Sequence, residues 1–359
     1  MIAVIADDFT GAAELAGISL RYGLQVEIFL NEIATTKADV VIVCTDSRSL
    51  NIAEAKKITA AAIKNVLKLK PAFIYKKIDS VLRGHVMEEI KVQMECCEMN
   101  KALILPANPS LGRTISNGEY FIAGKKITGT GFISDPEFPV RSSFVKEIVN
   151  DDNVKVLKHT QALPSAGTVI AEATGSDDIK QWASKINEEW ILVGAGDFYT
   201  ALLDKNYHTK PQTHFELRSP HLYVCGTAFN ERKAFIKKLN SVAYMPTTIS
   251  NEWLNKTGEI LKQQNKLVIA IDVSDEPALA LRTTMAKAVK EIVQQQNVKE
   301  IFIEGGSTAA AILQELNIVQ LSPVNELQRG VVRMKANDCF ITVKPGSYQL
   351  PQEIIDLYS

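Results

Sequence analysis

The stretch MIAVIADDFTGAAELAGISL, residues 1–20, decides the fold of the N-terminal half of the chain. Its residues 2–6 are all apolar, which is typical of a strand buried on both faces of a sheet. Two acids, Asp7 and Asp8, come next, and an apolar pattern with helical spacing then occupies residues 12–22. We therefore predict a strand, a turn that carries the two acids, and a helix that returns over the sheet.

The same alternation of short apolar runs and amphipathic stretches continues along the chain. Further strands are predicted at residues 26–30, 40–44, 73–75, 102–105 and 190–193, with helices at 53–69 and 87–99. Such alternation predicts a parallel sheet with helices on both faces. Residues 112–139 interrupt it with many Gly, Pro and Ser residues, which indicates long ordered loops or a small β insertion.

A second alternating series begins with a strand at residues 222–225. It continues with a helix at 231–239, a strand at 267–271, a helix at 277–295, a strand at 300–304 and a helix at 308–316. The polar stretch 204–220 contains two prolines and is the predicted linker. Because 359 residues exceed what one core usually supports, we predict an α/β protein of two domains, residues 1–215 and 216–359. Each is expected to be a mostly parallel sheet flanked by helices, with the active site in the cleft between them.

The charges of the chain nearly cancel, since it has 40 Lys and Arg residues and 41 Asp and Glu residues. Without a net field, we expect neither nucleic acid nor a membrane as a partner. The five cysteines lack the spacing of a zinc site or a CxxC pair, which favours a reducing compartment. The N-terminus has no basic leader. We therefore expect a cytoplasmic protein, and the sequence leaves open whether it forms a homo-oligomer.

Candidate site residues stand at the carboxyl ends of the predicted strands, where open α/β sheets bind ligands. Asp7 and Asp8 follow the first strand. Thr10 is expected to cap the next helix, and Gly11 is expected to allow close approach to the N-terminus of that helix. Arg48, shortly after the strand at 40–44, offers a planar fork to a carboxylate.

The segment 75–86 combines two lysines, an Asp, an Arg and a His between a strand and a helix. This composition indicates a loop that binds anions and hydroxyl groups. Arg113, beside Gly112 after the next predicted strand, is a further candidate, although turn chemistry alone could explain its surroundings. The candidate substrate-binding residues of the two segments are Lys77, Ile78, Asp79, Ser80, Arg83, Gly84, His85 and Arg113.

Three glycine turns that carry hydroxyl groups follow predicted strands of the C-terminal half. Backbone N–H groups at such turns, together with the positive end of a helix dipole, bind phosphates. The chain has neither the P-loop pattern nor the dinucleotide fingerprint. The three turns together nevertheless predict a nucleotide site, whose candidate residues are Thr227, Gly305, Gly306, Ser307, Thr308 and Gly346.

In this order, the motifs resemble the four-carbon acid sugar kinase family, which includes D-threonate, D-erythronate and 3-oxo-tetronate kinases. The matching segments are residues 7–12, 45–48, 77–85, 112–114, 135–136, 305–309 and 344–347. The resemblance implies an N-terminal acid-sugar domain, a C-terminal ATP domain, and magnesium. It assigns substrate contacts to Asp8 or Asp7, Arg48 and residues 77–80. It assigns ATP contacts to Thr227, residues 305–308 and Gly346.

The predicted function is therefore ATP-dependent phosphorylation of the terminal hydroxyl of a four-carbon sugar acid in carbohydrate catabolism, with ATP and Mg²⁺ as cofactors. One alternative is a non-catalytic module that senses a sugar acid and a nucleotide. Another is an oxidoreductase, against which the missing dinucleotide fingerprint counts. The sequence leaves open the tetronate stereoisomer or oxo acid and the metal ligands.

Phosphoryl transfer requires mainly positioning and stabilisation of charge. In this hypothesis Arg48, Arg83 and Lys77 neutralise the substrate carboxylate and the transferred phosphoryl group. A carboxylate accepts the hydroxyl proton. The candidate bases, in order of preference, are Asp8, Asp7 and Asp79.

Overall fold

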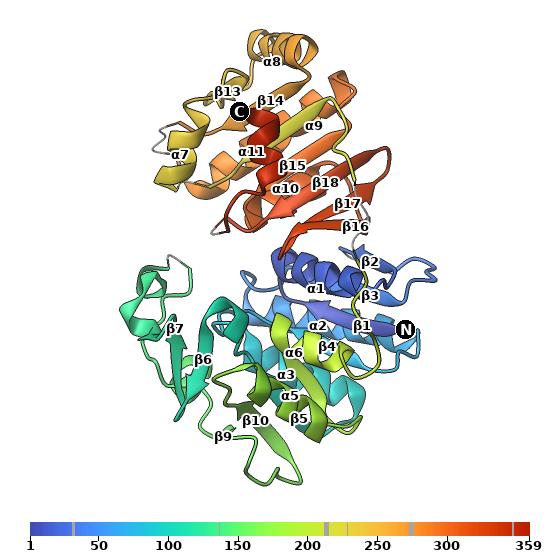
Figure 1. Ribbon diagram of the computed structural model, residues 1–359, viewed down its shortest axis with the longest axis vertical. Coiled ribbons are helices and arrows are strands. Elements are labelled where there is room, and N and C mark those ends of the chain that lie inside the picture. The colour runs from blue at the N-terminus through green and yellow to red at the C-terminus, as the bar shows by residue number, and fades with distance from the viewer. Residues whose placement is uncertain (31–32, 136, 212–214, 228, 273–275, 347) are drawn as a thin grey trace. The chain divides into compact units, whose positions relative to one another are not determined.

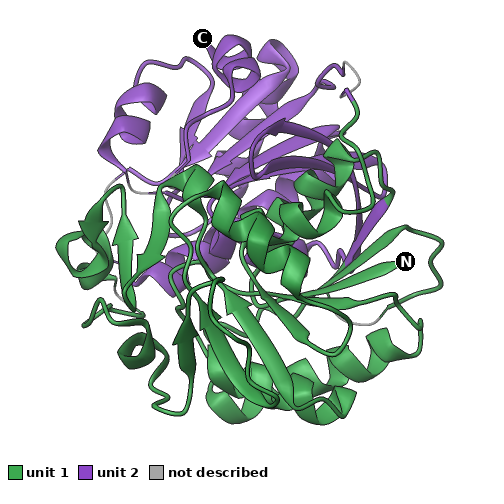
Figure 2. Ribbon diagram, turned by 60° about the horizontal axis from the view of Figure 1, so that its bottom comes forward, with its two compact units in different colours: residues 1–25, 29–210 green, residues 26–28, 211–359 purple. Residues whose placement is uncertain are grey.

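The computed structural model describes residues 1–30, 33–135, 137–211, 215–227, 229–272, 276–346 and 348–359, and it confirms an α/β chain (Figure 1). The chain divides into two compact units (Figure 2). Unit 1 comprises Met1–Gln25 and Phe29–Lys210, and unit 2 comprises Val26–Ile28 and Pro211–Ser359. The main division between the units thus follows Lys210, and the domain boundary near residue 215 remains a prediction from the sequence.

Unit 1 contains a parallel sheet in the order β3-β1-β4-β11-β5-β10-β9. Because β1 lies between β3 and β4, the loops that follow these three strands meet at one edge of the sheet. The strands are β1 (Ile2–Ala6), β3 (Val40–Cys44), β4 (Ile74–Lys77), β5 (Lys101–Leu105), β9 (Lys155–Leu157), β10 (Gly167–Ala171) and β11 (Ile191–Gly194), and β2 is Val26–Phe29. The helices are α1 (Phe9–Arg21), α2 (Ile52–Leu67), α3 (Val86–Cys97), α4 (Val145–Val149), α5 (Ser176–Lys185) and α6 (Gly196–Leu203).

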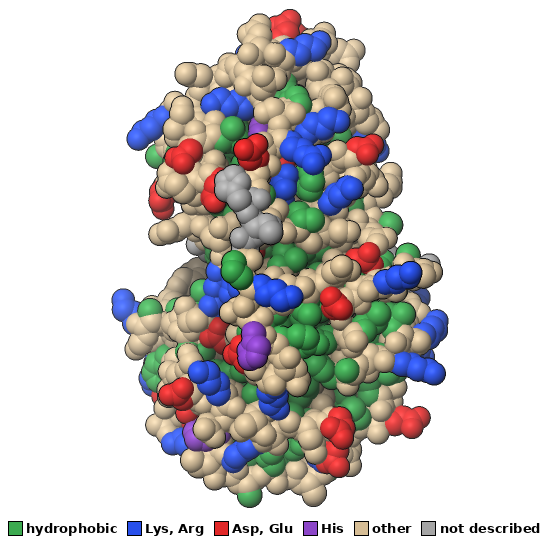
Figure 3. Space-filling view, turned by 45° about the vertical axis from the view of Figure 1, so that its right-hand side comes forward, with side chains coloured by type: hydrophobic (Ala, Val, Ile, Leu, Met, Phe, Trp, Pro, Cys, Tyr) green, Lys and Arg blue, Asp and Glu red, His purple; other side chains and the backbone are tan. Residues whose placement is uncertain are grey.

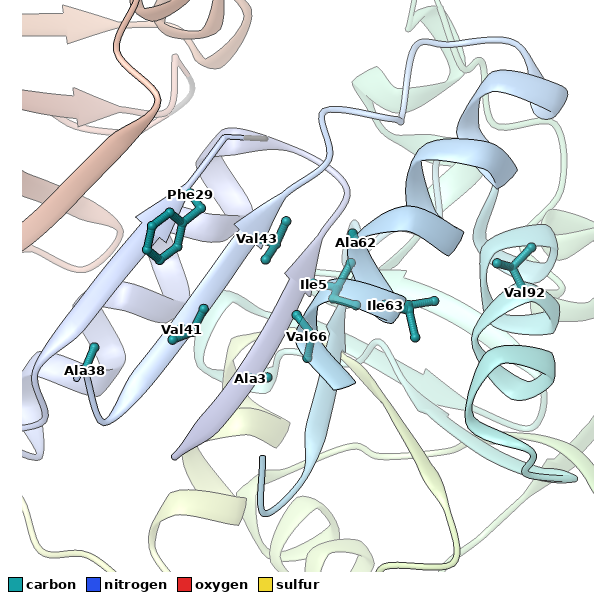
Figure 4. Close-up of a cluster of buried hydrophobic side chains, with 10 residues drawn as sticks. All are labelled: Ala3, Ile5, Phe29, Ala38, Val41, Val43, Ala62, Ile63, Val66 and Val92. Carbon is teal, nitrogen blue, oxygen red and sulfur yellow. The ribbon is translucent and has the colours of Figure 1, made fainter. Parts of the chain in front are cut away.

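The core of unit 1 forms where alternate residues of the strands meet helices. Ala3 and Ile5 of β1 pack in one buried cluster with Val41 and Val43 of β3 and with Ile63 of α2 (Figure 4). On the strands these side chains are two residues apart, so they share one face of the sheet. Burying them against α2 and α3 fixes the sheet edge at which Asp7 and Asp8 emerge.

The segment predicted as long loops or a β insertion contains a small antiparallel sheet, with strand order β6-β7-β8. Its strand β6 is joined to the segment that follows β10 by the hydrogen bond from Ile115 N to Ala173 O, at 2.9 Å. The strands are β6 (Arg113–Ser116), β7 (Glu119–Ile122) and β8 (Lys125–Lys126), and the short 3₁₀ helices are η1 (Pro109–Leu111), η2 (Ile127–Gly129) and η3 (Gly131–Ser134). The hairpin thus starts at Arg113, one of the predicted site residues.

Unit 2 contains a sheet in the order β13-β14-β12-β15-β18-β17-β16. The first five strands pair in parallel, whereas β17 and β16 continue the sheet antiparallel, which the sequence did not indicate. The strands are β12 (His221–Cys225), β13 (Val242–Tyr244), β14 (Lys266–Ala270), β15 (Glu300–Glu304), β16 (Gln320–Gln328), β17 (Val331–Ala336) and β18 (Cys339–Lys344). The helices are α7 (Asn230–Ile236), α8 (Asn251–Gln264), α9 (Ala278–Gln295), α10 (Gly306–Glu315) and α11 (Gln352–Tyr358).

The surface carries charges of both signs. On the face shown in Figure 3, lysines and arginines are interspersed with acids on both units. This distribution agrees with the near-zero net charge of the sequence. In the parts of the chain that the structure describes, no helix has the length and apolar character needed to cross a membrane.

Candidate active site

Helix α1 begins directly after the two acids, and Asp8 is its N-cap. The Asp8 carboxylate accepts a hydrogen bond from Gly11 N at 2.8 Å and another from the Thr10 hydroxyl at 2.5 Å. The expectation that Thr10 caps the helix was therefore wrong, because the carboxylate two residues earlier accepts from the free N–H group. Capping fixes the rotamer of Asp8, which is the most exposed of the three candidate bases, with 18% of its side chain exposed.

Arg48 binds both acids of the first turn. Its Nε and Nη2 donate to the two oxygens of Asp7 at 2.9 and 3.0 Å, and its Nη1 donates to Asp8 Oδ2 at 2.9 Å. Burial raises the pKa of Asp7 above its ordinary value. Burial also acts to raise the pKa of Asp8, but Arg48 and Lys77 outweigh it and lower that pKa. The carboxylate fork that the sequence assigned to a substrate is thus filled by Asp7.

Lys77 occupies the space left open by Gly11. A Cβ at Gly11 would lie 2.9 Å from Lys77 Nζ and 2.6 Å from Asp8 Oδ1. Lys77 is buried, and its Nζ lies 3.3 Å from Glu14 Oε2 and donates to Ile78 O at 3.0 Å. The glycine therefore allows a side chain of the same chain to approach. Glu14 was missed by the sequence analysis, although a carboxylate within the apolar pattern of a helix is an unusual feature.

Asp79 is held by Arg83 in a two-pronged ion pair. Arg83 Nε and Nη2 donate to the Asp79 oxygens at 2.9 and 3.0 Å, and Arg83 Nη1 donates to Asp135 of the insertion at 2.8 Å. Although Asp79 is buried, Arg48 and Arg83 lower its pKa well below the ordinary value. The Asp79 side chain is 8% exposed, against 18% for Asp8, so Asp79 is the less accessible of these two candidate bases.

Ser80 accepts hydrogen bonds from two residues of the β6–β7 hairpin. Arg113 Nη1 donates to the Ser80 hydroxyl, and the Tyr120 hydroxyl donates to Ser80 O at 2.8 Å. Ser80 and Tyr120 are buried, whereas Arg113 is half-buried. The hairpin thus brings Arg113 next to the loop that follows β4, as predicted for a residue at the same edge of the sheet.

A second layer of buried residues supports the loop that carries Arg48. The Ser47 hydroxyl donates to Glu89 Oε1 at 2.6 Å, and Glu89 Oε2 lies 2.5 Å from Nζ of the fully buried Lys76. Gly84 has a φ of +89°, and a Cβ there would lie 2.9 Å from Arg48 Cγ. Both features hold the Arg48 side chain against the acids. The sequence analysis counted Lys76 among the two lysines of the segment 75–86 but did not name it as a site residue, and it did not identify Glu89.

His85 has a different position from the other predicted residues. Its Nε2 lies 2.6 Å from Leu50 O, so the ring binds the backbone of the loop that follows β3. Arg48 pairs with Asp7 and Asp8, and the charge of Lys77 acts on Asp8, whereas the hydrogen bond of the His85 ring goes to Leu50. We interpret His85 as a residue that orders this loop.

In unit 2 the three glycine turns begin at the same level. The parallel register pairs Cys225 with Glu304, and Glu304 with Lys344, so β12, β15 and β18 end side by side. Gly226 N donates to Glu304 O, and Gly305 N donates to Lys344 O, each at 2.9 Å. Two of the N–H groups expected for phosphate are therefore used within the sheet. The first turn of α10 has no side-chain cap, so its N–H groups remain for a ligand.

A cavity of about 440 Å³ lies beside the turns that follow β12 and β15. Gly226, Thr227, Ser307 and Thr308 of these two turns are part of its lining. The remaining lining residues are the apolar Ile271, Ala278, Leu281 and Met285 and the charged Lys233, Asp272 and Arg282. A cavity of this size with an apolar wall and a few polar groups suits a ligand such as a nucleotide. The sequence predicted the turns but not the wall, whose residues come from α9 and the end of β14.

Of the other predicted residues, Gly305 and Gly306 form the turn itself, and Gly346 lines a neighbouring cavity of about 710 Å³. Gly305 has a φ of +112°, which explains the glycine. Lys344, next to the third turn, is fully buried, with its Nζ 2.9 Å from Glu304 Oε1 and 2.5 Å from Tyr348 O. Lys344 therefore orders the turn and does not face a ligand.

Comparison with known proteins agrees with this division of sites. A family model described as a sugar-binding N-terminal domain matches residues 2–202, and one described as a nucleotide-binding C-terminal domain matches residues 252–348. A D-threonate kinase of Salmonella typhimurium is 35% identical over 246 residues, which cover 62% of this chain and 57% of that protein. The match thus spans little more than half of that relative's length.

Two further likenesses extend over most of the chain. A D-threonate kinase of Bordetella bronchiseptica is 23% identical over 367 residues, which cover 92% of this chain and 88% of that protein. A crystal structure of a Haemophilus influenzae protein has the same fold, with a TM-score of 0.78 and 16% identity over 99% of this chain and 98% of that one. Since the N-terminal model alone matches residues 2–202 of 359, the chain belongs to the four-carbon acid sugar kinase family, in which a sugar-binding domain precedes a nucleotide-binding domain.

Proposed function

We propose that this protein is a kinase that transfers the γ-phosphoryl group of ATP to the terminal hydroxyl of a four-carbon sugar acid. The observation that carries the proposal is the cavity beside the ends of β12 and β15, which lie side by side in the sheet. The cavity is lined by the first turn of α10, which has no side-chain cap, and by apolar side chains. Names of relatives such as D-threonate kinase support the substrate class. We place the reaction in carbohydrate catabolism and in the cytoplasm.

For the nucleotide, the cavity offers two kinds of surface. We propose that Thr227, Ser307 and Thr308 bind the phosphates, because these hydroxyl-bearing residues line the cavity and two of them belong to the uncapped first turn of α10. The apolar side chains of α9 then contact the base. Gly226 is required at this end, because a Cβ there would lie 2.0 Å from Thr308 Oγ1.

Magnesium is expected to accompany ATP. Among the described residues, no group of three or more His, Cys, Asp or Glu side chains could hold a metal ion by itself. This donor set fits Mg²⁺ that is held mainly by phosphates and water, with one or two carboxylates. Asp272 lines the cavity and is the residue that we propose for that role. When bound, the ion would neutralise charge on the phosphate oxygens.

For the sugar acid, we propose that Asp8 accepts the proton of the attacking hydroxyl. The hydroxyl oxygen forms a bond to the γ-phosphorus, the bond from that phosphorus to the β,γ-bridging oxygen breaks, and ADP leaves with the bonding pair. Asp8 is capped and paired with Arg48, so its position is fixed before the substrate binds. Asp7 keeps Arg48 in place, and Lys77 balances charge beside Asp8.

The test combines an ADP-release assay with a variant of the cavity wall. Wild-type protein should release ADP with at least one acid from a panel of D- and L-threonate, D- and L-erythronate and oxo-tetronates. Leu281→Glu should raise the KM for ATP by about tenfold or more, because it places a charge on the apolar wall. Leu279→Glu is the matched control, since Leu279 is on the same helix, is 65% exposed and is not part of the lining.

The outcomes separate the candidate functions. Binding of both ligands without ADP release would refute the kinase and support the sensing module. Equal KM values for ATP in Leu281→Glu and wild type would refute the position of the nucleotide.

A further inference from the structure

Three arginines, Arg48, Arg83 and Arg113, lie near Asp79, and they differ in the partners that their side chains contact. Arg83 forms a two-pronged pair with Asp79, and Arg48 Nη1 lies 3.9 Å from Asp79 Oδ1. Arg113 donates to the adjacent Ser80, close enough to contribute to the low pKa of Asp79. A sugar acid that binds beside this cluster brings one more negative charge, so one of these cations must remain available for it.

The forks of Arg48 and Arg83 are already filled. Each of the three nitrogens of Arg48 donates to Asp7 or Asp8, and each of the three nitrogens of Arg83 donates to Asp79 or Asp135. On each guanidinium the Nε–Nη2 side is occupied by an acid, so a ligand carboxylate could take that side only by displacing this acid. Leaving that acid buried without its partner is unfavourable.

Arg113 differs from both. Its side chain donates a hydrogen bond to the neutral Ser80 hydroxyl, and among the described residues no carboxylate lies within ion-pair distance of it. It is half-buried, which strengthens a charge–charge contact but leaves the guanidinium accessible. The rest of its planar set of N–H donors suits a carboxylate.

The hairpin holds Arg113 in a defined position. Asn108 N and Arg113 O are hydrogen bonded at 2.8 Å, and the Tyr120 hydroxyl donates to Ser80 O at 2.8 Å from the paired strand β7. These contacts attach β6 and β7 to the loop that follows β4. The side chain is thus placed before a ligand arrives, which lowers the entropy lost on binding.

From these contacts we infer that Arg113, carried by the β6–β7 hairpin, binds the carboxylate of the sugar acid, and that Arg48 and Arg83 serve to fix the acids of the site. Ser80 accepts a hydrogen bond from Arg113, so its own proton is free to be donated to a hydroxyl or keto oxygen of the same ligand. The hairpin is then the element that distinguishes a sugar acid from the corresponding uncharged tetritol. This inference rests on the proposed function for the identity of the ligand.

The test measures binding separately from turnover. D-threonate and D-erythronate are titrated calorimetrically into wild type, Arg113→Met, Arg113→Lys and Lys126→Met, and ADP release is measured with each acid and with threitol and erythritol. Lys126 is the matched control, because it is an exposed cation of the same small sheet, paired with Glu119. Thermal unfolding of each variant shows that it is folded.

Arg113→Met should weaken binding of the acid by about ten- to a hundredfold, because a charged hydrogen-bond partner is lost. Arg113→Lys, which keeps the charge but not the fork, should lose less, and Lys126→Met should bind as wild type does. Activity with the tetritols should change less than about threefold in Arg113→Met.

Equal acid binding by Arg113→Met and wild type would overturn the inference, as would equal losses for acids and tetritols. Failure of wild type to bind any acid of the panel of threonates, erythronates and oxo-tetronates would overturn it together with the ligand class. If wild type binds an acid but releases no ADP, the kinase proposal fails, while the comparison of binding still decides the role of Arg113.

Discussion

Arg48→Met should destabilise unit 1 in a way that depends on pH. The substitution removes the cation that binds Asp7 through two hydrogen bonds and Asp8 through a third. The side chains of Arg48, Asp7 and Asp8 are 14%, 5% and 18% exposed, so these ion pairs are largely buried. Removing one partner of a buried ion pair costs about 3–5 kcal/mol of stability. At neutral pH the free energy of unfolding should fall by about that amount.

The sign of the pH dependence follows from the two acids. Burial and Asp8 already raise the pKa of Asp7, and without Arg48 the pKa values of both acids should rise further in the folded state. A carboxyl whose pKa is raised on folding costs stability above that pKa, and the cost disappears as the pH falls and the group takes up a proton. The difference between variant and wild type should therefore be largest near pH 7 and smaller at pH 5.

Urea unfolding followed by circular dichroism at pH 5, 6, 7 and 8 measures this difference. Asp7→Asn added to Arg48→Met should restore part of the stability at pH 7, because it removes one uncompensated charge. Arg141→Met is a control for loss of an exposed arginine of the same unit and should change stability by about 0.5 kcal/mol or less. A loss below about 1 kcal/mol in Arg48→Met at pH 7, or a loss that grows as the pH falls, would refute the reasoning.

The remaining predictions use single substitutions. Asp8→Asn should lower kcat by about 10²–10⁴-fold with ATP affinity near wild type, and a larger kcat defect in Asp7→Asn would reverse the choice of base. Gly11→Ala should cost about 1–3 kcal/mol in urea unfolding, because its Cβ would lie 2.6 Å from Asp8 Oδ1, and unchanged stability would contradict this packing. Burial lowers the pKa of His221 to about 4, so the unfolded state binds the proton more readily and stability should fall as the pH drops from about 6.5 towards 4. His221→Gln should weaken that pH dependence in the same unfolding measurement, and an unchanged profile would rule out His221 as its source.

The sequence by itself determined which positions along the chain carry the candidate site residues. Continuous apolar runs identify buried strands, and polar residues directly after them must emerge at the carboxyl edge of a parallel sheet. Asp7, Asp8 and Arg48 were identified in this way, and the order β3-β1-β4 brings them together. The glycine turns after residues 225 and 304 were identified for the same reason. The register of β12 and β15 pairs Cys225 with Glu304, so the two turns lie side by side.

Only the tertiary structure decided which partner each side chain has. Arg48 and Asp7 are 41 residues apart, and nothing local indicates that the guanidinium faces an acid of the chain and not a ligand. The cavity wall likewise depends on how α9 packs beside β14, which a helical pattern alone does not specify. Arg113 contacts Ser80, 33 residues earlier, only because the folded hairpin brings the two side chains together. Periodicity is a local property, whereas pairing of charges depends on distances that exist only after the chain has folded.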